Sequence, residues 1–127
     1  MRAVRVFSDG DGESHFEDFE IELQPVDFAP PAPPLLLSET ADASGFALMS
    51  CPPGWYGDWH PAPRRQWLLW LSGTTRIEVS DGEVRDISAG TVMLSEDITG
   101  RGHRTWQIGD EPVLIAAIQI PYPAVAD

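Results

Sequence analysis

The chain has 127 residues, of which 8 are basic and 20 are acidic, so its formal net charge is −12. A protein this acidic repels phosphate, which argues against nucleic acid and anionic membranes as partners. No apolar run is long enough to span a bilayer and no cleavable leader is visible, so we expect a cytoplasmic protein. The single cysteine, Cys51, excludes an intrachain disulfide, and a lone cysteine is more often a small core residue than a catalyst.

The N-terminal part of the sequence predicts two strands and a proline-rich segment. Residues 2–7 are rich in β-branched side chains, and a cluster of turn-forming residues follows them. Residues 15–23 alternate along a half-buried strand, with Phe19 on the more apolar face and Phe16 on the other. Residues 27–34 contain too many prolines for the interior of a sheet, so we expect an extended segment that wraps over the surface.

The remainder of the chain predicts further short strands. Residues 66–72 are apolar on both faces, and we expect them to form a central, buried strand. Ser80-Asp81-Gly82 lies between the alternating runs 76–79 and 83–87, which indicates a hairpin. Turn residues also bound strands expected at 46–51, 91–94, 103–108 and 113–120.

Together these elements predict an all-β fold with almost no helix. About ten short antiparallel strands in a chain of this length are typical of a closed or nearly closed barrel. Neither half of the chain would hold a core alone, so we expect one domain over residues 1–127. Within it, residues 1–45 supply the N-terminal strands and the proline-rich segment, and residues 46–120 form the barrel that carries the motifs described below.

A glycine and histidine pattern in the barrel segment resembles the first motif of the cupin family, G-x5-H-x-H-x3-E-x6-G. The same spacing here holds Gly54, His60, Ala62, Gln66 and Gly73, so three defining positions match and two are substituted. A looser likeness to the second cupin motif is carried by Gly90, by Glu96 in place of a proline, and by His103 after Gly100-Arg101-Gly102. The chain therefore resembles a cupin over roughly residues 46–120.

The resemblance implies an antiparallel jelly-roll β-barrel that holds one divalent metal ion in its mouth. Carried over by position, it implies His60 and His103 as metal ligands, with Gln66 in place of the glutamate and no ligand at Ala62. An amide oxygen offers a cation only a dipole, and one imidazole is missing, so this set would bind a metal weakly. The identity of the metal stays open among zinc, iron, manganese and nickel.

Two residues could replace the missing ligands. Asp58 precedes His60 by two positions, so on a regular strand it would join His60 and His103 in a two-histidine, one-carboxylate set. The alternative for Asp58 is a solvated loop residue, because Gly57 interrupts the strand pattern. His15 is the second candidate, and its alternative is a hydrogen-bonded surface histidine.

Several polar and aromatic residues near the motifs are candidates for the wall of a substrate pocket. Trp70 shares a strand face with Gln66 and is expected to line the cavity, and Trp59 is a further aromatic candidate. Gln66 is expected either as a weak metal ligand or as a hydrogen-bonding partner of a substrate. The alternative for the aromatic residues is ordinary packing in the core and at its rim.

Charged residues beside the motifs form a second set of candidates. Arg65 or Arg101 could anchor a substrate carboxylate, and the alternative for both is ion pairing with the many acidic residues. Glu96-Asp97 could act as an acid or a base, and the alternative is a turn on the surface.

Three functions are compatible with these residues. The first is an enzyme acting on an aromatic or unsaturated small molecule, with a divalent metal on His60 and His103 supporting isomerase, cyclase, lyase or dioxygenase chemistry. The second has no metal and uses a histidine as general base, with Gln66 or an arginine polarising a carbonyl group. The third is a non-catalytic barrel that binds a small ligand. Residues 27–37 carry apolar side chains without a core role, so we also expect a homodimer.

Overall fold

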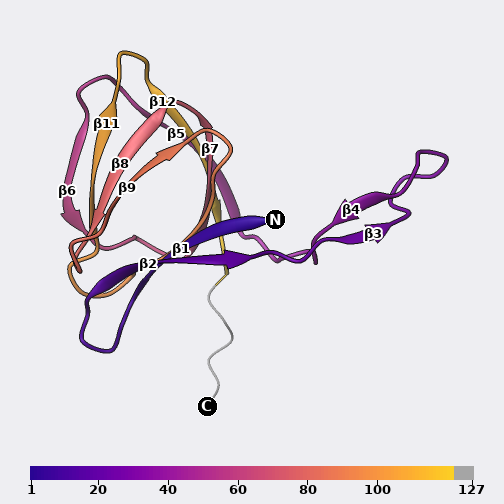
Figure 1. Cartoon of the computed structure of the whole chain (residues 1–127), viewed down its shortest axis with the longest axis horizontal. Helices are drawn as coiled ribbons and strands as arrows, with labels where there is room; N and C mark the ends of the chain where they lie inside the picture. Colours follow the sequence, from indigo (N-terminus) through magenta and orange to yellow (C-terminus); the bar gives the residue numbers. More distant parts are fainter. Residues whose placement is uncertain (122–127) are drawn as a thin grey trace.

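The computed structural model describes residues 1–121 as two facing sheets and a projecting hairpin (Figure 1). The larger sheet has six strands in the order β2-β1-β10-β7-β12-β5, namely β1 (Arg2–Ser8), β2 (Ser14–Glu20), β5 (Gly45–Cys51), β7 (Gln66–Ser72), β10 (Val92–Glu96) and β12 (Val113–Gln119). The smaller sheet has four in the order β6-β11-β8-β9, namely β6 (Tyr56–His60), β8 (Thr74–Val79), β9 (Val84–Ser88) and β11 (His103–Ile108).

The connections between the sheets define the architecture. From β5 onward the chain crosses from one sheet to the other at every connection except the β8–β9 hairpin. This winding of two sheets is a jelly roll. Neighbouring strands are antiparallel apart from β1 and β10, which run parallel. Residues 1–121 contain no helix, and hence none that could span a membrane. The predicted all-β jelly roll is therefore confirmed.

The hydrophobic core lies between the two sheets. Its buried side chains come from both, and include Val4, Val6, Phe16, Trp70, Ile77, Val79, Met93 and Ile115. Fully burying one such side chain stabilises the fold by about 1.5–3 kcal/mol. Trp70 is 3% exposed, and its indole nitrogen donates a hydrogen bond to Thr75 Oγ1 at 3.2 Å, so burial leaves no unpaired donor there. As the sequence predicted, β7 is central, lying between β10 and β12. It is not buried on both faces as predicted, because only Gln66 and Trp70 are buried and Leu71 is 49% exposed.

Strand β2 differs from its prediction in length and in its buried face. It ends at Glu20, three residues before the predicted end. Phe16 faces the core because β2 pairs with β1 in a register that places it opposite Val6, which is 2% exposed. Phe19 lies on the outer face instead and packs on Trp67, with 6.4 Å between the ring centroids.

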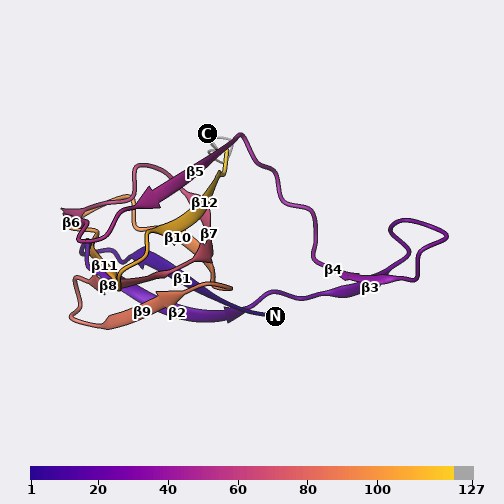
Figure 2. The same cartoon turned by 90° about the horizontal axis from the view of Figure 1, so that it is seen from above.

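The proline-rich segment does not wrap over the surface, and that prediction is wrong. It forms a short hairpin, β3 (Gln24–Val26) and β4 (Leu35–Leu37), which projects away from the two sheets (Figure 2). The prolines keep residues 27–34 out of the large sheets but allow a turn, in which the Ala32 N–H donates to the Ala29 carbonyl at 2.9 Å. Leu36 is 64% exposed, so the apolar side of this arm is largely uncovered in the single chain.

A glycine brings the ends of β6 and β11 together. Gly102 has a φ of +74°, and a Cβ at this position would lie 2.0 Å from the His60 carbonyl oxygen. Only a residue without a side chain allows this approach, and a positive φ also favours glycine. The contact fixes the start of β11 beside the end of β6, where His60 and His103 are register partners.

Candidate functional site

A cavity of about 480 Å³ lies between the two sheets. Its wall is mainly apolar, with Val6, Leu68, Trp70, Ile77, Met93 and Ile115 among the lining residues. His60 and Trp55 also line it and are exposed, so the cavity opens to solvent beside them. A volume of this size fits a small organic molecule.

His60 and His103 lie side by side in the cavity wall. His60 is the last residue of β6 and His103 the first of β11, and the two are paired in the register. Their ring centroids are 4.8 Å apart and the ring planes are inclined by 57°. The structure thus brings together the two histidines that the sequence singled out.

Each of these imidazoles is oriented by a hydrogen bond at Nδ1. His103 Nδ1 lies 2.5 Å from Asp97 Oδ2, and His60 Nδ1 lies 2.6 Å from the Asp58 carbonyl oxygen. A backbone carbonyl oxygen and an ionised carboxylate are acceptors and have no hydrogen to donate. The hydrogen in each of these two bonds is therefore on Nδ1 of the ring. The Nε2 atoms keep their lone pairs when the rings are neutral, and they are the atoms available for chemistry.

Asp97 is fully buried behind His103. Its side chain is 0% exposed and accepts a second, longer hydrogen bond from Ser95 Oγ at 3.4 Å. Its backbone carbonyl accepts from the Ala62 N–H at 2.9 Å, which ties the β6–β7 loop to the β10–β11 loop. The sequence raised Asp97 only as half of a charged pair. The sequence offered two signals that Asp97 could contact His103, namely their separation of six residues and the glycine-rich turn between them.

Gln66 and Ser95 extend the polar part of the wall. They are register partners on β7 and β10, and both line the cavity. The Gln66 residue is only 9% exposed, and its side chain reaches the cavity wall. Trp70 follows on the same face of β7, as the alternation predicted. A polar strip therefore runs from Gln66 through Ser95 to the histidines.

Asp58 lies outside the cavity lining, although it belongs to the same strand as His60. His60 pairs with His103 and Gly57 pairs with Thr105. Two residues separate His60 from Gly57 on β6, but one residue separates His103 from Thr105 on β11, so β6 has a bulge that interrupts its regular alternation. The Asp58 carboxylate accepts hydrogen bonds from the Trp59 N–H at 2.8 Å and the Tyr56 hydroxyl at 3.0 Å. These two bonds lower its pKa. Asp58 contributes its backbone carbonyl to His60, not its carboxylate.

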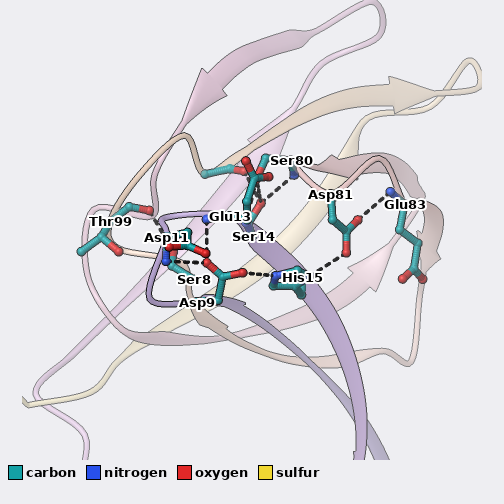
Figure 3. Close-up of polar contacts among 11 residues, drawn as sticks. Ser8, Asp9, Asp11, Glu13, Ser14, His15, Ser80, Asp81, Glu83 and Thr99 are labelled. Carbon is teal, nitrogen blue, oxygen red and sulfur yellow. Dashed lines mark hydrogen bonds and ion pairs between the residues drawn. The ribbon is translucent and has the colours of Figure 1, made fainter.

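His15 lies in a separate cluster that joins two turns (Figure 3). Its Nε2 is 2.7 Å from Asp9 Oδ2, and its Nδ1 is 2.8 Å from Asp81 Oδ2. The hydrogen bonds to Asp9 and then to Asp81 raise the pKa of His15. Beside it, Ser14 Oγ donates to the Gly102 carbonyl at 2.6 Å. The His15 ring is fully engaged in holding the β1–β2 turn to the β8–β9 turn.

The arginines proposed as substrate anchors are engaged elsewhere. Arg65 Nε donates to Glu96 Oε2 at 2.6 Å, and Arg5 binds the other oxygen of the same carboxylate. Burial opposes ionisation of Glu96, but the two arginines outweigh it and lower its pKa. Arg101 stacks on Trp59, with 4.1 Å from its guanidinium carbon to the ring centroid. None of Arg65, Arg101 and Trp59 is among the residues that line the cavity.

The donors at the cavity fit a metal ion only in part. Within residues 1–121, no three histidine, cysteine or acidic side chains stand together as a ligand group. His60 and His103 offer two imidazole nitrogens, and Gln66 offers an amide oxygen. Ala62 is buried at the position where the cupin motif has a second histidine. A complete centre of at least three strong ligands is therefore not present in this part of the chain.

Comparisons with known proteins give matches among solved structures only. No family model matches the chain, and no curated protein matches its sequence. An oxalate decarboxylase from Bacillus subtilis matches 62% of this chain at 31% identity with a TM-score of 0.44, and the chain spans only 22% of that protein chain.

Two further matches have lower identity. The Cupin_2 domain of an XRE-family transcriptional regulator from Enterobacter cloacae matches at 20% identity and a TM-score of 0.41, over 61% of this chain and 82% of its own. The capsular polysaccharide assembling protein CapF from Staphylococcus aureus matches at 17% identity and a TM-score of 0.45, over 84% of this chain and 30% of its own. With TM-scores this low, no activity is transferred from these proteins. The chain is a jelly roll of two sheets, and the motif spacing that pairs His60 with His103 resembles that of cupins.

Proposed function

We propose that this protein is an enzyme that binds a small, mainly apolar molecule in the cavity and uses His103 as its general acid or base. The observation that carries the proposal is the hydrogen bond from His103 Nδ1 to the buried carboxylate of Asp97. A carboxylate in this position holds the imidazole in one tautomer and stabilises it when it takes up a proton. The opposite nitrogen, Nε2, is then the atom that exchanges a proton with the substrate.

The neighbouring groups have supporting roles. His60 lies against His103 and also has its Nδ1 occupied, so it offers a second Nε2 to the same molecule. Gln66 can donate a hydrogen bond to a carbonyl group or accept one from a hydroxyl group of the substrate. The apolar wall excludes water and strengthens these polar interactions. An isomerase, cyclase or lyase that moves a proton on an unsaturated small molecule fits this set of groups.

A divalent cation shared by His60 and His103 is the second candidate. It is favoured by the orientation of the rings, because histidine ligands of metals usually donate their other nitrogen to a carboxylate or a carbonyl. Such a cation would act as a Lewis acid towards a substrate oxygen. Because no third histidine, cysteine or acidic side chain stands with these two histidines in the described residues, and the Gln66 amide offers only a dipole, we expect weak binding that depends on the concentration of free metal.

The test is turnover of a compound selected by binding to the full chain. Activity that survives a chelator and falls by about 10²–10⁴-fold in His103→Gln would support the acid–base proposal. His15→Gln is the matched control and should retain activity, because His15 lies in the separate cluster. Activity that disappears with the chelator and returns with zinc, iron, manganese or nickel would replace the proposal by the second candidate. A compound that binds and is recovered unchanged would contradict both enzymatic candidates and would indicate that the protein only binds its ligand.

A further inference from the structure

All the positively charged side chains of the chain, apart from histidine, lie outside the cavity. The chain has 8 basic residues, and all are arginine. Six of them form ion pairs with acidic side chains: Arg2, Arg5, Arg65, Arg76, Arg85 and Arg104. Arg64 donates to the Gln119 side chain at 2.9 Å, and Arg101 stacks on Trp59. None of the eight lines the cavity.

Negative charge is also absent from the cavity surface. Among residues 1–121, no aspartate or glutamate is part of the lining. Asp97 lies behind His103 and its side chain is 0% exposed, so a ligand in the cavity cannot reach it. While His60 and His103 are neutral, a charged group placed here would lose part of its hydration without gaining a partner of opposite sign, which disfavours its binding.

The polar groups that do line the cavity are uncharged or are histidines, and they lie together. Gln66 and Ser95 are register partners, and His60 and His103 are register partners on the other sheet. The Ser95 hydroxyl and His103 both contact Asp97, which connects the two pairs. Thr105, two positions after His103 on β11, and Ser50 on β5 also line the cavity, and the remaining wall, including Trp70, is mainly apolar. The uncharged polar groups are therefore concentrated along one strip, and most of the wall elsewhere is apolar.

We propose that the ligand of this cavity is an uncharged amphipathic molecule, with an apolar body of about the size of a two-ring compound and one hydroxyl, carbonyl or amide group. The apolar body packs on the Trp70 side, and the polar group bonds to the strip that begins at Gln66. This inference rests on the proposed function for the existence of a ligand, and adds its charge class. It also removes the carboxylate anchor that Arg65 or Arg101 would have supplied.

The experiment compares three probes of one shape and different charge. Binding of 2-naphthol, 2-naphthoate and 2-naphthylmethylammonium to the full chain is measured by isothermal titration calorimetry at about pH 8. The inference expects 2-naphthol to bind at least about ten-fold more tightly than either ion. If the anion or the cation binds as tightly as 2-naphthol, the inference is wrong, whereas the proposed role of His103 stands. If none of the three binds, the inference is likewise wrong, and the turnover experiment described above decides the proposed function separately.

A variant at the strip tests the placement of the polar group. Gln66→Leu removes the amide and keeps a side chain of similar size, so binding of 2-naphthol should weaken about five- to ten-fold. Gln24→Leu is the matched control, because Gln24 is exposed on the arm, and it should leave binding unchanged. Circular dichroism and thermal unfolding of both variants establish that the fold is retained. Unchanged affinity in a folded Gln66→Leu variant would contradict the placement.

Discussion

The two histidine clusters of this protein use the same side chain for different purposes. In the first, both ring nitrogens of His15 are bonded to carboxylates, at 2.7 and 2.8 Å. Because an ionised carboxylate only accepts, both bonds form at once only when the ring is protonated. In the second, His60 and His103 each have one bonded nitrogen and leave Nε2 available beside an apolar cavity. The first cluster joins two turns, and only the second has atoms available for a reaction.

The junction between the two clusters should be the most sensitive point of the fold. Gly102 contacts Ser14 of the first cluster and His60 of the second, and a Cβ there would lie 2.0 Å from a carbonyl oxygen. We expect Gly102→Ala to lower the free energy of unfolding by about 2–4 kcal/mol. The measurement is urea denaturation.

Gly82→Ala is the matched control for this change. Gly82 also has a positive φ, +98°, but a Cβ there meets nothing within 4 Å. Its cost should be limited to the backbone strain of about 1–2 kcal/mol. Equal losses in the two variants would show that the approach of Gly102 to His60 has no special energetic weight.

Replacing the buried Asp97 should lower the free energy of unfolding more than replacing an exposed aspartate does. Asp97→Asn replaces the buried acceptor of His103 Nδ1 by a neutral amide, and we expect a loss of about 1–3 kcal/mol in unfolding free energy. Asp110→Asn, on an exposed turn, should change stability by less than about 0.5 kcal/mol. Urea denaturation of both variants is the measurement. A silent Asp97→Asn would mean that the bond to His103 contributes nothing to the folded state.

The His15 cluster should make stability depend on pH. The pKa of His15 is raised above 6.5 by Asp9 and Asp81, so the folded state binds the proton more tightly than the unfolded chain. The contribution is fully present below pH 6.5 and is lost as the pH rises through the raised pKa. We expect the unfolding free energy of the wild type, relative to His15→Gln, to decline across this window. The hydrogen bond to His15 also lowers the pKa of Asp9. The contribution of Asp9 to stability is therefore present above pH 3.8 and is lost as the pH falls through its lowered pKa. A pH-independent difference between the two proteins would contradict this account of His15.

The arm should affect association and not the stability of the two sheets. Leu35 and Leu36 are 52% and 64% exposed in the single chain, and the predicted homodimer would cover them. In sedimentation velocity at micromolar concentration, we expect the wild type to be a dimer and the double variant Leu35→Ser/Leu36→Ser to shift towards monomer. The unfolding free energy of the double variant should differ from that of the wild type by less than about 0.5 kcal/mol. Asp27→Ser on the same arm is the control. A monomeric wild type would refute the homodimer.

The fold was largely predictable from the sequence because its signals are local. The hairpin at Ser80-Asp81-Gly82 and the central strand β7 follow from turn chemistry and from apolar runs. The projecting arm was not predictable, because the prolines that exclude residues 27–34 from the sheet interior do not say where the segment goes. The inward face of β2 depends on the register with β1, which the alternation of one strand does not contain.

The proximity of the two motif histidines was predictable from the sequence, but the groups around them were not. The motif spacing indicated His60 and His103, and in the structure the centroids of their rings are 4.8 Å apart. The bulge in β6 that turns Asp58 away from the cavity, and the buried bond between Asp97 and His103, arise from contacts between segments distant in the chain. A charged pair before a glycine-rich turn gave too weak a signal to identify Asp97.

The most direct test of the central claim is the tautomer of each histidine, measured by long-range ¹H–¹⁵N NMR correlation on the full chain. The account predicts that neutral His60 and His103 carry the hydrogen on Nδ1 and a lone pair on Nε2, since their Nδ1 atoms donate to the Asp58 carbonyl and the Asp97 carboxylate. It also predicts that His15 stays doubly protonated to higher pH than an ordinary histidine. Neutral His103 with its hydrogen on Nε2 would contradict the proposed role of His103, because the nitrogen proposed to act on the ligand would then have no lone pair to accept a proton.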